Sequence, residues 1–139
     1  MSCEAVYSEL VRAAVVARAR AYAPYSRFAV GAAVLTADGR VFAGSNVENA
    51  SYGLTICAER VAIFSAVAAG AREMAALAVS AVPASFPCGA CRQVLAELAQ
   101  ASCPVLVADG ESLVAVARLA EILPHAFSAA NLDPPVRLG

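Results

Sequence analysis

The sequence has 139 residues, a net charge of -1 and a sequence pI of about 5.8, and 60% of its residues are hydrophobic. This length fits one domain, residues 1–139, with a substantial buried core. The arginines are scattered, so we expect no nucleic-acid partner. The longest uncharged run, residues 74–91, is interrupted by Pro83 and Pro87, so we expect no membrane partner either.

The first half of the chain predicts a helix, a hairpin and a second helix. Apolar residues at helical spacing predict a helix over residues 4–22, which ends at AYAPYS. Two β-rich runs, 28–35 and 41–47, flank an Asp-Gly turn signal and predict a hairpin. A loop over 48–55 follows, and then a helix over 57–70 with Gly70 as its C-cap.

The second half predicts three strands and two helices. They are listed here in chain order: a buried strand over 74–82, a helix over 88–100, strands over 104–109 and 112–119, and a short helix within 119–127 that Pro124 stops. Strands joined by a crossover helix are expected to be parallel neighbours, whereas the turn at Asp109-Gly110 is too short for a crossover. The predicted fold is α/β, with a mixed five-stranded sheet, helices on both faces and an antiparallel last pair of strands.

Five cysteines are present, and three of them open predicted helices. Cys57 begins one crossover helix, and Cys88 and Cys91 begin the next, within PCGACRQ. A CxxC pair can be a redox couple, half of a metal site or two core residues. Because both helices start at the same edge of the sheet, the three thiols can meet there. Helix N-termini favour thiolates, and three thiolates that leave a fourth position for water are typical of a catalytic zinc site.

Charged residues beside these cysteines suggest further roles. Glu59 could exchange protons with water at the metal, although a Glu in a first helical turn also complements the helix dipole. Arg60 directly follows Glu59, and Arg92 directly follows Cys91; each could donate hydrogen bonds to the sulfurs, or could be a surface arginine. His125, Cys3 and Cys103 are not expected to bind the metal.

Several motifs together resemble a known family. FAVGAA (28–33), NVENASYG (46–53), CAER (57–60), PCGACRQ (87–93) and ILPHAF (122–127) resemble the small homotetrameric cytidine deaminases, in order and spacing. The resemblance covers about residues 4–132 and implies the three-layer α-β-α fold of that family. It also implies hydrolytic deamination of cytidine and 2′-deoxycytidine in pyrimidine salvage, with one zinc per chain.

The same resemblance implies roles for individual residues. Zinc would be held by Cys57, Cys88 and Cys91, and Glu59 would move protons between water, N3 of the base and the leaving amine. The substrate-binding residues would be Phe28, Asn46, Glu48, Ala58 and Phe127. Phe127 would reach the base of a neighbouring subunit, which places the active sites of a homotetramer at subunit interfaces. Phe86 departs from the small residue that related enzymes often have before PCG.

Three alternatives remain at this point. A deaminase of a cytosine-containing antibiotic such as blasticidin S would share the catalytic pattern but differs in the NVENASYG loop. A nucleic-acid-editing deaminase would need basic and aromatic surface. A structural zinc or redox protein would need a fourth ligand or a reversible disulfide. The N-terminus lacks the pattern of a secretory signal, so we expect a cytoplasmic protein, and the apolar composition favours an oligomer.

Overall fold

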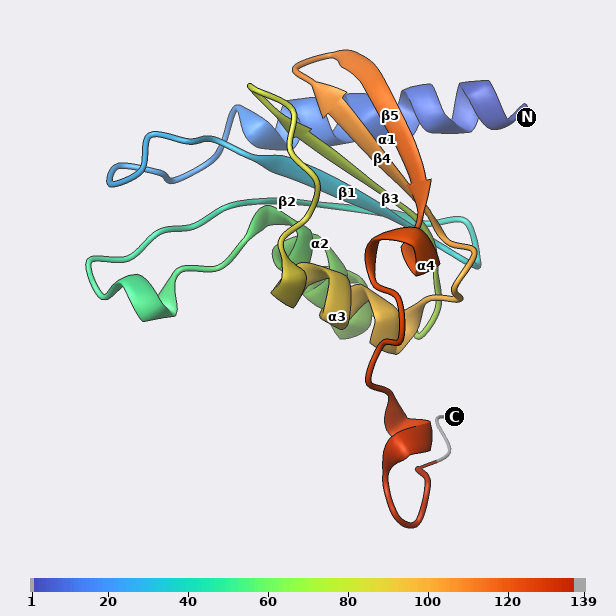
Figure 1. Cartoon of the computed structure of the whole chain (residues 1–139). Helices are drawn as coiled ribbons and strands as arrows, with labels where there is room; N and C mark the ends of the chain where they lie inside the picture. Colours follow the sequence, from blue (N-terminus) through green and yellow to red (C-terminus); the bar gives the residue numbers. More distant parts are fainter. Residues whose placement is uncertain (1, 137–139) are drawn as a thin grey trace.

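The computed structural model describes residues 2–136, so Met1 and residues 137–139 of the predicted domain lie outside the described residues. A five-stranded sheet in the order β2-β1-β3-β4-β5 forms the centre of the molecule (Figure 1). The strands are β1 (Gly31–Thr36), β2 (Val41–Ser45), β3 (Met74–Ala81), β4 (Pro104–Asp109) and β5 (Ser112–Arg118). No helix within residues 2–136 combines the length and apolarity that crossing a membrane requires.

Helices cover both faces of this sheet. The helices are α1 (Cys3–Arg18), α2 (Ala58–Ala68), α3 (Gly89–Leu98) and the short α4 (Leu119–Ile122), with two 3-10 turns, η1 (Tyr52–Leu54) and η2 (Ala129–Asn131). Figure 1 shows α1 on one face and α2 with α3 on the other, so the predicted three layers are present.

Strand pairing agrees with the prediction of a mixed sheet and corrects one part of it. β1 pairs antiparallel with both β2 and β3, and β4 pairs antiparallel with β5. β3 and β4, which α3 connects, pair in parallel. β2 and β3 run in the same direction, as expected, because both are antiparallel to β1. The expectation that they are neighbours was wrong, because the hairpin places β1 between them.

The three inner strands are buried on both faces, and each face packs against a different helix layer. On β3, Leu77 and Val79 belong to the core beneath α2 and α3. Ala76 and Ala78 alternate with them and belong to the core beneath α1. This alternation follows from the two-residue period of a strand, and burial on both sides accounts for the high apolar fraction of the sequence.

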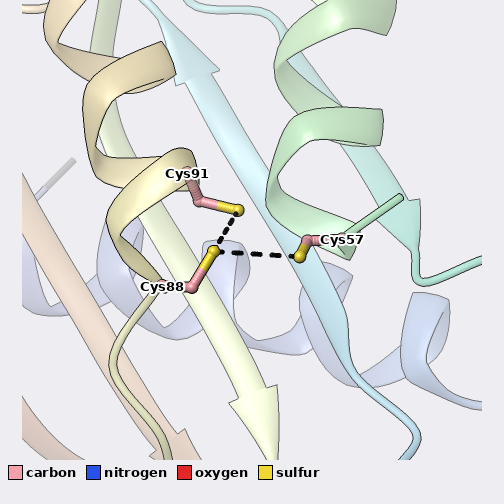
Figure 2. A group of neighbouring side chains, drawn as sticks. All are labelled: Cys57, Cys88 and Cys91. Carbon is pink, nitrogen blue, oxygen red and sulfur yellow. Dashed lines mark hydrogen bonds between the residues drawn. The ribbon is translucent and has the colours of Figure 1, made fainter. Parts of the chain in front are cut away.

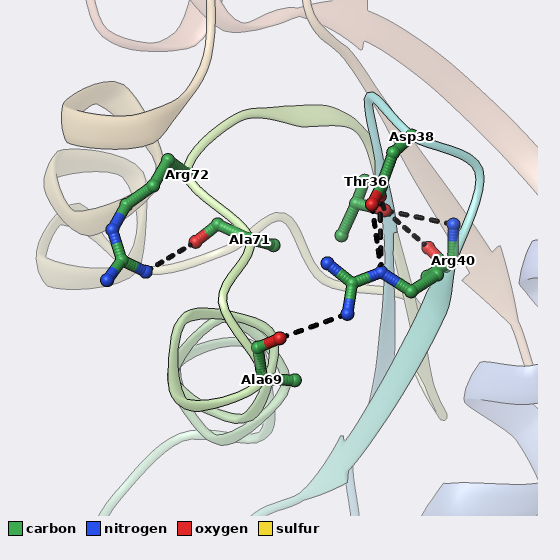
Figure 3. Close-up of polar contacts among 6 residues, drawn as sticks. All are labelled: Thr36, Asp38, Arg40, Ala69, Ala71 and Arg72. Carbon is green, nitrogen blue, oxygen red and sulfur yellow. Dashed lines mark hydrogen bonds and ion pairs between the residues drawn. The ribbon is translucent and has the colours of Figure 1, made fainter. Parts of the chain in front are cut away.

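The hairpin turn between β1 and β2 is tied to the C-terminal end of α2 (Figure 3). Arg40 donates from Nε to Asp38 at 3.0 Å and from Nη1 to the carbonyl of Ala69 at 3.0 Å. The backbone N–H of Arg40 donates to Thr36 Oγ1. The Arg40 guanidinium lies at the C-terminal end of α2, where a positive charge complements the helix dipole. Gly70, with φ 99°, follows the helix as the predicted glycine stop, and the Ala71 N–H donates to the Ala66 carbonyl.

At the opposite end, α2 lies unusually close to β2. A Cβ added at Gly44 would lie 2.5 Å from Ala62 N and 2.7 Å from Ala58 O, both of them backbone atoms of α2. Glycine is therefore what allows the first turns of α2 to rest directly on the strand.

The two largest differences from the predicted element boundaries both lie near the candidate site. α1 ends at Arg18 rather than residue 22, since Tyr22 leaves the helix and its N–H donates to the Asn46 carbonyl at 2.9 Å. β1 begins at Gly31 rather than residue 28, because the Asn46 side chain takes the place of a strand partner for residues 28–30.

Candidate metal centre and active site

Three cysteines converge where α2 and α3 begin. Cys57 is the N-cap of α2, Cys88 is the N-cap of α3, and Cys91 lies in the first turn of α3. Figure 2 shows their Sγ atoms pointing toward one another from the two helix starts. Among residues 2–136 they form the only group of three or more His, Cys, Asp or Glu residues with ligand atoms close enough to hold one metal ion.

The spacing of the sulfurs fits zinc. The Sγ atoms of Cys57 and Cys88 lie 3.9 Å apart, and those of Cys88 and Cys91 lie 3.5 Å apart. With Zn–S bonds of about 2.3 Å, tetrahedral geometry requires sulfur atoms about 3.8 Å apart. Two of the three separations are thus close to the tetrahedral value, and all three sulfurs lie within 4.8 Å of one another. Within the described chain no fourth protein ligand joins them.

Neighbouring groups bias the Cys57 thiol toward the thiolate, the form that binds metal. A hydrogen bond from Cys91, with a further contribution from Arg60, lowers the pKa of Cys57 to about 5. The same contact with Cys57, together with burial, raises the pKa of the Cys91 thiol. Arg60 Nη2 lies 3.3 Å from Cys57 Sγ, so a fixed positive charge faces the sulfur cluster.

Arg92 does not occupy the position that the sequence suggested. Its Nε donates to the Pro87 carbonyl at 2.7 Å and its Nη1 to the Ile122 carbonyl at 2.8 Å. The prediction that Arg92 donates to sulfur was wrong, because these backbone carbonyls take up the guanidinium. Arg92 instead ties the segment before Cys88 to the end of α4.

A cavity of about 270 Å³ opens beside the sulfurs. It is lined by Ser26, Phe28, Val30, Asn46, Glu48, Thr55, Ile56, Cys57, Ala58, Glu59, Val79, Ser85, Phe86 and Cys88. The structure thus gathers there five of the predicted residues besides the thiols: Phe28, Asn46, Glu48, Ala58 and Glu59.

Glu59 is a buried carboxyl in this cavity. It lies one position after Ala58 in the first turn of α2 and is 5% exposed. Burial raises the pKa of Glu59, and the negative charge of a Cys57 thiolate raises it further. A carboxyl group whose pKa is raised in this way is suited to accepting and returning a proton.

Asn46 and Glu48 are held by the chain on either side of them. The Val47 N–H donates to the Ile56 carbonyl at 3.1 Å, and the Glu48 N–H donates to the Tyr22 carbonyl at 2.9 Å. Asn46 is 8% exposed; its Oδ1 accepts from the Val30 N–H and its Nδ2 donates to the Phe28 carbonyl. The segment that carries Asn46 and Glu48 is therefore held between the residues just before β1 and those just before α2.

The remaining predicted residues lie away from this cavity. Phe127 is 61% exposed, and its carbonyl accepts from Gln93 Nε2 at 2.8 Å. His125 and Cys3 are exposed, and Cys103 is buried, where burial raises its pKa to about 11. None of these three belongs to the sulfur cluster.

Sequence reasoning did not assign Ser26 or Thr55 to the cavity. Ser26 hydrogen-bonds to the Glu48 carboxylate, although the two residues are 22 positions apart. Only the folded turn before β1 brings them together, and no periodic pattern in the sequence marks such a contact. Phe86, which the sequence singled out as a departure, also lines the cavity.

Comparisons with known proteins show which family this chain is similar to. A family model described as the cytidine and deoxycytidylate deaminase zinc-binding region matches residues 5–107. The chain is 49% identical over 129 residues to the cytidine deaminase of Halalkalibacterium halodurans, covering 89% of this chain and 96% of the relative. It is 47% identical over 118 residues to the cytidine deaminase of Mycobacterium tuberculosis, covering 84% of this chain and 85% of the relative.

A solved structure extends the similarity to three dimensions. The 1.6 Å crystal structure of cytidine deaminase from Burkholderia pseudomallei aligns with a TM-score of 0.82 and 50% sequence identity. The alignment covers 91% of this chain and 100% of that chain.

Proposed function

Because this chain belongs to the cytidine and deoxycytidylate deaminase family, we propose that it converts cytidine and 2′-deoxycytidine, with water, to uridine and 2′-deoxyuridine plus ammonia. The observation that carries this proposal is the placement of the buried Glu59 carboxyl beside three converging thiols. One zinc ion per chain, held by Cys57, Cys88 and Cys91, would activate the water that attacks C4 of the base.

In this reaction Glu59 carries the protons. It accepts one from the attacking water and delivers it to N3 of the base. It then transfers the second proton of that water to the departing amine, so that ammonia leaves and a carbonyl oxygen remains at C4. Arg60 offsets the net negative charge of three thiolates and one divalent cation through its contact with Cys57.

The nucleoside is assigned to the cavity beside the thiols. Phe28 packs against the pyrimidine, and the backbone of Ala58 contacts the base. Asn46 and Glu48 hold the ribose hydroxyls, since an amide and a carboxylate offer both donors and acceptors. The position of all four residues in one cavity supports this assignment.

The charge of the cavity favours nucleosides over nucleotides. Two carboxyl groups, Glu48 and Glu59, line it, and none of its lining residues is Lys or Arg. A phosphate group there would face negative charge with no cation to pair it. CMP is therefore expected to be turned over less efficiently than cytidine.

The active enzyme is proposed to be a cytoplasmic homotetramer of single-domain chains that serves pyrimidine salvage. Phe127 reaches the base in a neighbouring subunit. Large apolar side chains that are exposed in the single chain support association, including Tyr52 at 73%, Leu54 at 71% and Phe127 at 61%.

The test is the loss of ultraviolet absorbance when purified protein meets cytidine, 2′-deoxycytidine, CMP and blasticidin S separately, with zinc quantified in the same sample. Turnover of both nucleosides with about one zinc per chain is expected. Zinc without turnover of either nucleoside would refute the proposal and point to the antibiotic or to a modified base.

A further inference from the structure

The Glu48 carboxylate is held by one short turn of the chain, Tyr25–Phe28. Its Oε1 accepts from the Tyr25 N–H at 2.9 Å and from the Ser26 N–H at 3.0 Å. Its Oε2 accepts from the Ser26 hydroxyl. Three donors from two adjacent residues thus fix the plane of this carboxylate before any ligand arrives.

The same hydroxyl also contacts the residue assigned to the base. Ser26 Oγ accepts from the Phe28 N–H at 3.0 Å. The carbonyl of Phe28 in turn accepts from Asn46 Nδ2 at 2.8 Å. Ser26 is therefore the centre of a chain of hydrogen bonds that joins Glu48, Phe28 and Asn46.

The backbone of the turn has an unusual conformation next to Ser26. Arg27 has φ 58°, a left-handed conformation that non-glycine residues rarely adopt. The turn closes with a hydrogen bond from the Arg27 N–H to the Ala23 carbonyl at 3.0 Å. This conformation lets Ser26 face Glu48 while Phe28 faces the cavity, and strained residues of this kind are found at binding sites.

Glu48 also lies where two cavities adjoin. A second cavity, of about 330 Å³, is lined by Tyr25, Ser26, Glu48, Tyr52 and Thr55. Three of these residues, Ser26, Glu48 and Thr55, line the cavity beside the thiols as well. With three donors on its protein side, the carboxylate retains acceptor capacity for a hydroxyl group of a ligand in these cavities.

We propose that Ser26 is a positioning residue for substrate recognition: its hydroxyl orients the Glu48 carboxylate toward the sugar hydroxyls. This inference rests on the proposed function, because it assigns the sugar to Glu48. The hydrogen bond from Ser26 also lowers the pKa of Glu48, which keeps the group an acceptor. Ser26 itself takes no part in the chemical step.

The test compares Ser26→Ala with Ser26→Thr, which keeps a hydroxyl, and with Ser112→Ala on β5 as a matched control. Three quantities are measured for zinc-loaded protein: kcat for cytidine, KM for cytidine, and the inhibition constant of 2′,3′-dideoxycytidine as a competitor. The competitor lacks the 2′- and 3′-hydroxyls, which this inference assigns to Glu48, and keeps only the 5′-hydroxyl.

We expect Ser26→Ala to raise KM for cytidine about tenfold, as expected for loss of a hydrogen bond to a charged group, with kcat within about twofold of wild type. The inhibition constant of the dideoxy competitor should stay unchanged, and Ser26→Thr should recover most of the wild-type KM. Ser112→Ala should match wild type throughout.

Two results would overturn the inference separately from the proposed function. If wild type deaminates cytidine but Ser26→Ala leaves KM unchanged, Ser26 does not position Glu48. If KM and the competitor's inhibition constant rise equally, Ser26 acts on the whole cavity rather than on the sugar. Wild-type protein that turns over no nucleoside would refute the proposed function, and this inference with it.

Discussion

Replacement of Gly44 by Ala should disturb both the stability of the fold and the active site, because α2 rests directly on this residue. The added Cβ would lie 2.5 Å from Ala62 N, whereas ordinary contacts begin at 3.4 Å, so α2 must move away from β2 by about 0.9 Å. The two nearest atoms, Ala62 N and Ala58 O, belong to the backbone, so rotation of a side chain cannot relieve the contact. Overpacking of this kind costs about 1–3 kcal/mol of unfolding free energy.

For a domain of this size the cost corresponds to a fall in Tm of about 4–12 °C. The first turn of α2 carries Glu59 and is capped by Cys57. A displacement of about 1 Å at a catalytic group lowers kcat/KM by about 100-fold. Thermal unfolding and cytidine turnover of the zinc-loaded protein measure the two effects.

Gly53→Ala is the matched control, because a Cβ at Gly53 meets nothing within 4 Å. Its Tm should equal that of wild type or rise slightly. If Gly44→Ala resembled Gly53→Ala in both Tm and kcat/KM, the close contact between α2 and β2 would not be what positions the site.

Three further changes test other parts of the site. Glu59→Gln should retain zinc and the wild-type Tm but lower kcat by about 10²- to 10⁴-fold, because an amide cannot carry the proton. Turnover near the wild-type rate would contradict the role assigned to Glu59. Phe127→Ala should raise KM for cytidine several-fold by removing about one aromatic contact from the neighbouring active site, and an unchanged KM would count against that contact. In the zinc-loaded protein, a thiol reagent at pH 8 should modify only Cys3 rapidly, and a chelator should release three more thiols. Cys103 should react last, since burial holds its pKa at about 11; early reaction of Cys103 would show that the core beneath α3 opens readily.

The sequence predicted the parts of this protein that follow from local pattern. Cys57, Cys88 and Cys91 each lie at a helix start that follows a strand or loop, so their meeting could be predicted from the order of elements alone. The Asp-Gly turns and the buried runs likewise placed every strand to within a few residues.

Contacts between distant side chains could not be predicted in this way. Arg92 was expected at the sulfurs because it follows Cys91, yet the carbonyls of Pro87 and Ile122 take up its guanidinium. Nothing local indicates that Ser26 meets Glu48, or that β1 separates β2 from β3. Such features depend on packing between elements, which a single sequence encodes only through the complete fold.

The three thiols come from two helices whose first ligands, Cys57 and Cys88, are 31 positions apart along the chain. Since the unfolded chain presents no such preformed set of ligands, an ion bound there favours folding by mass action. At a free zinc concentration about a thousand times the dissociation constant, this linkage is worth about 4 kcal/mol. Metal supply would then control not only how fast each molecule works but also what fraction of the chains survives as folded protein under zinc limitation.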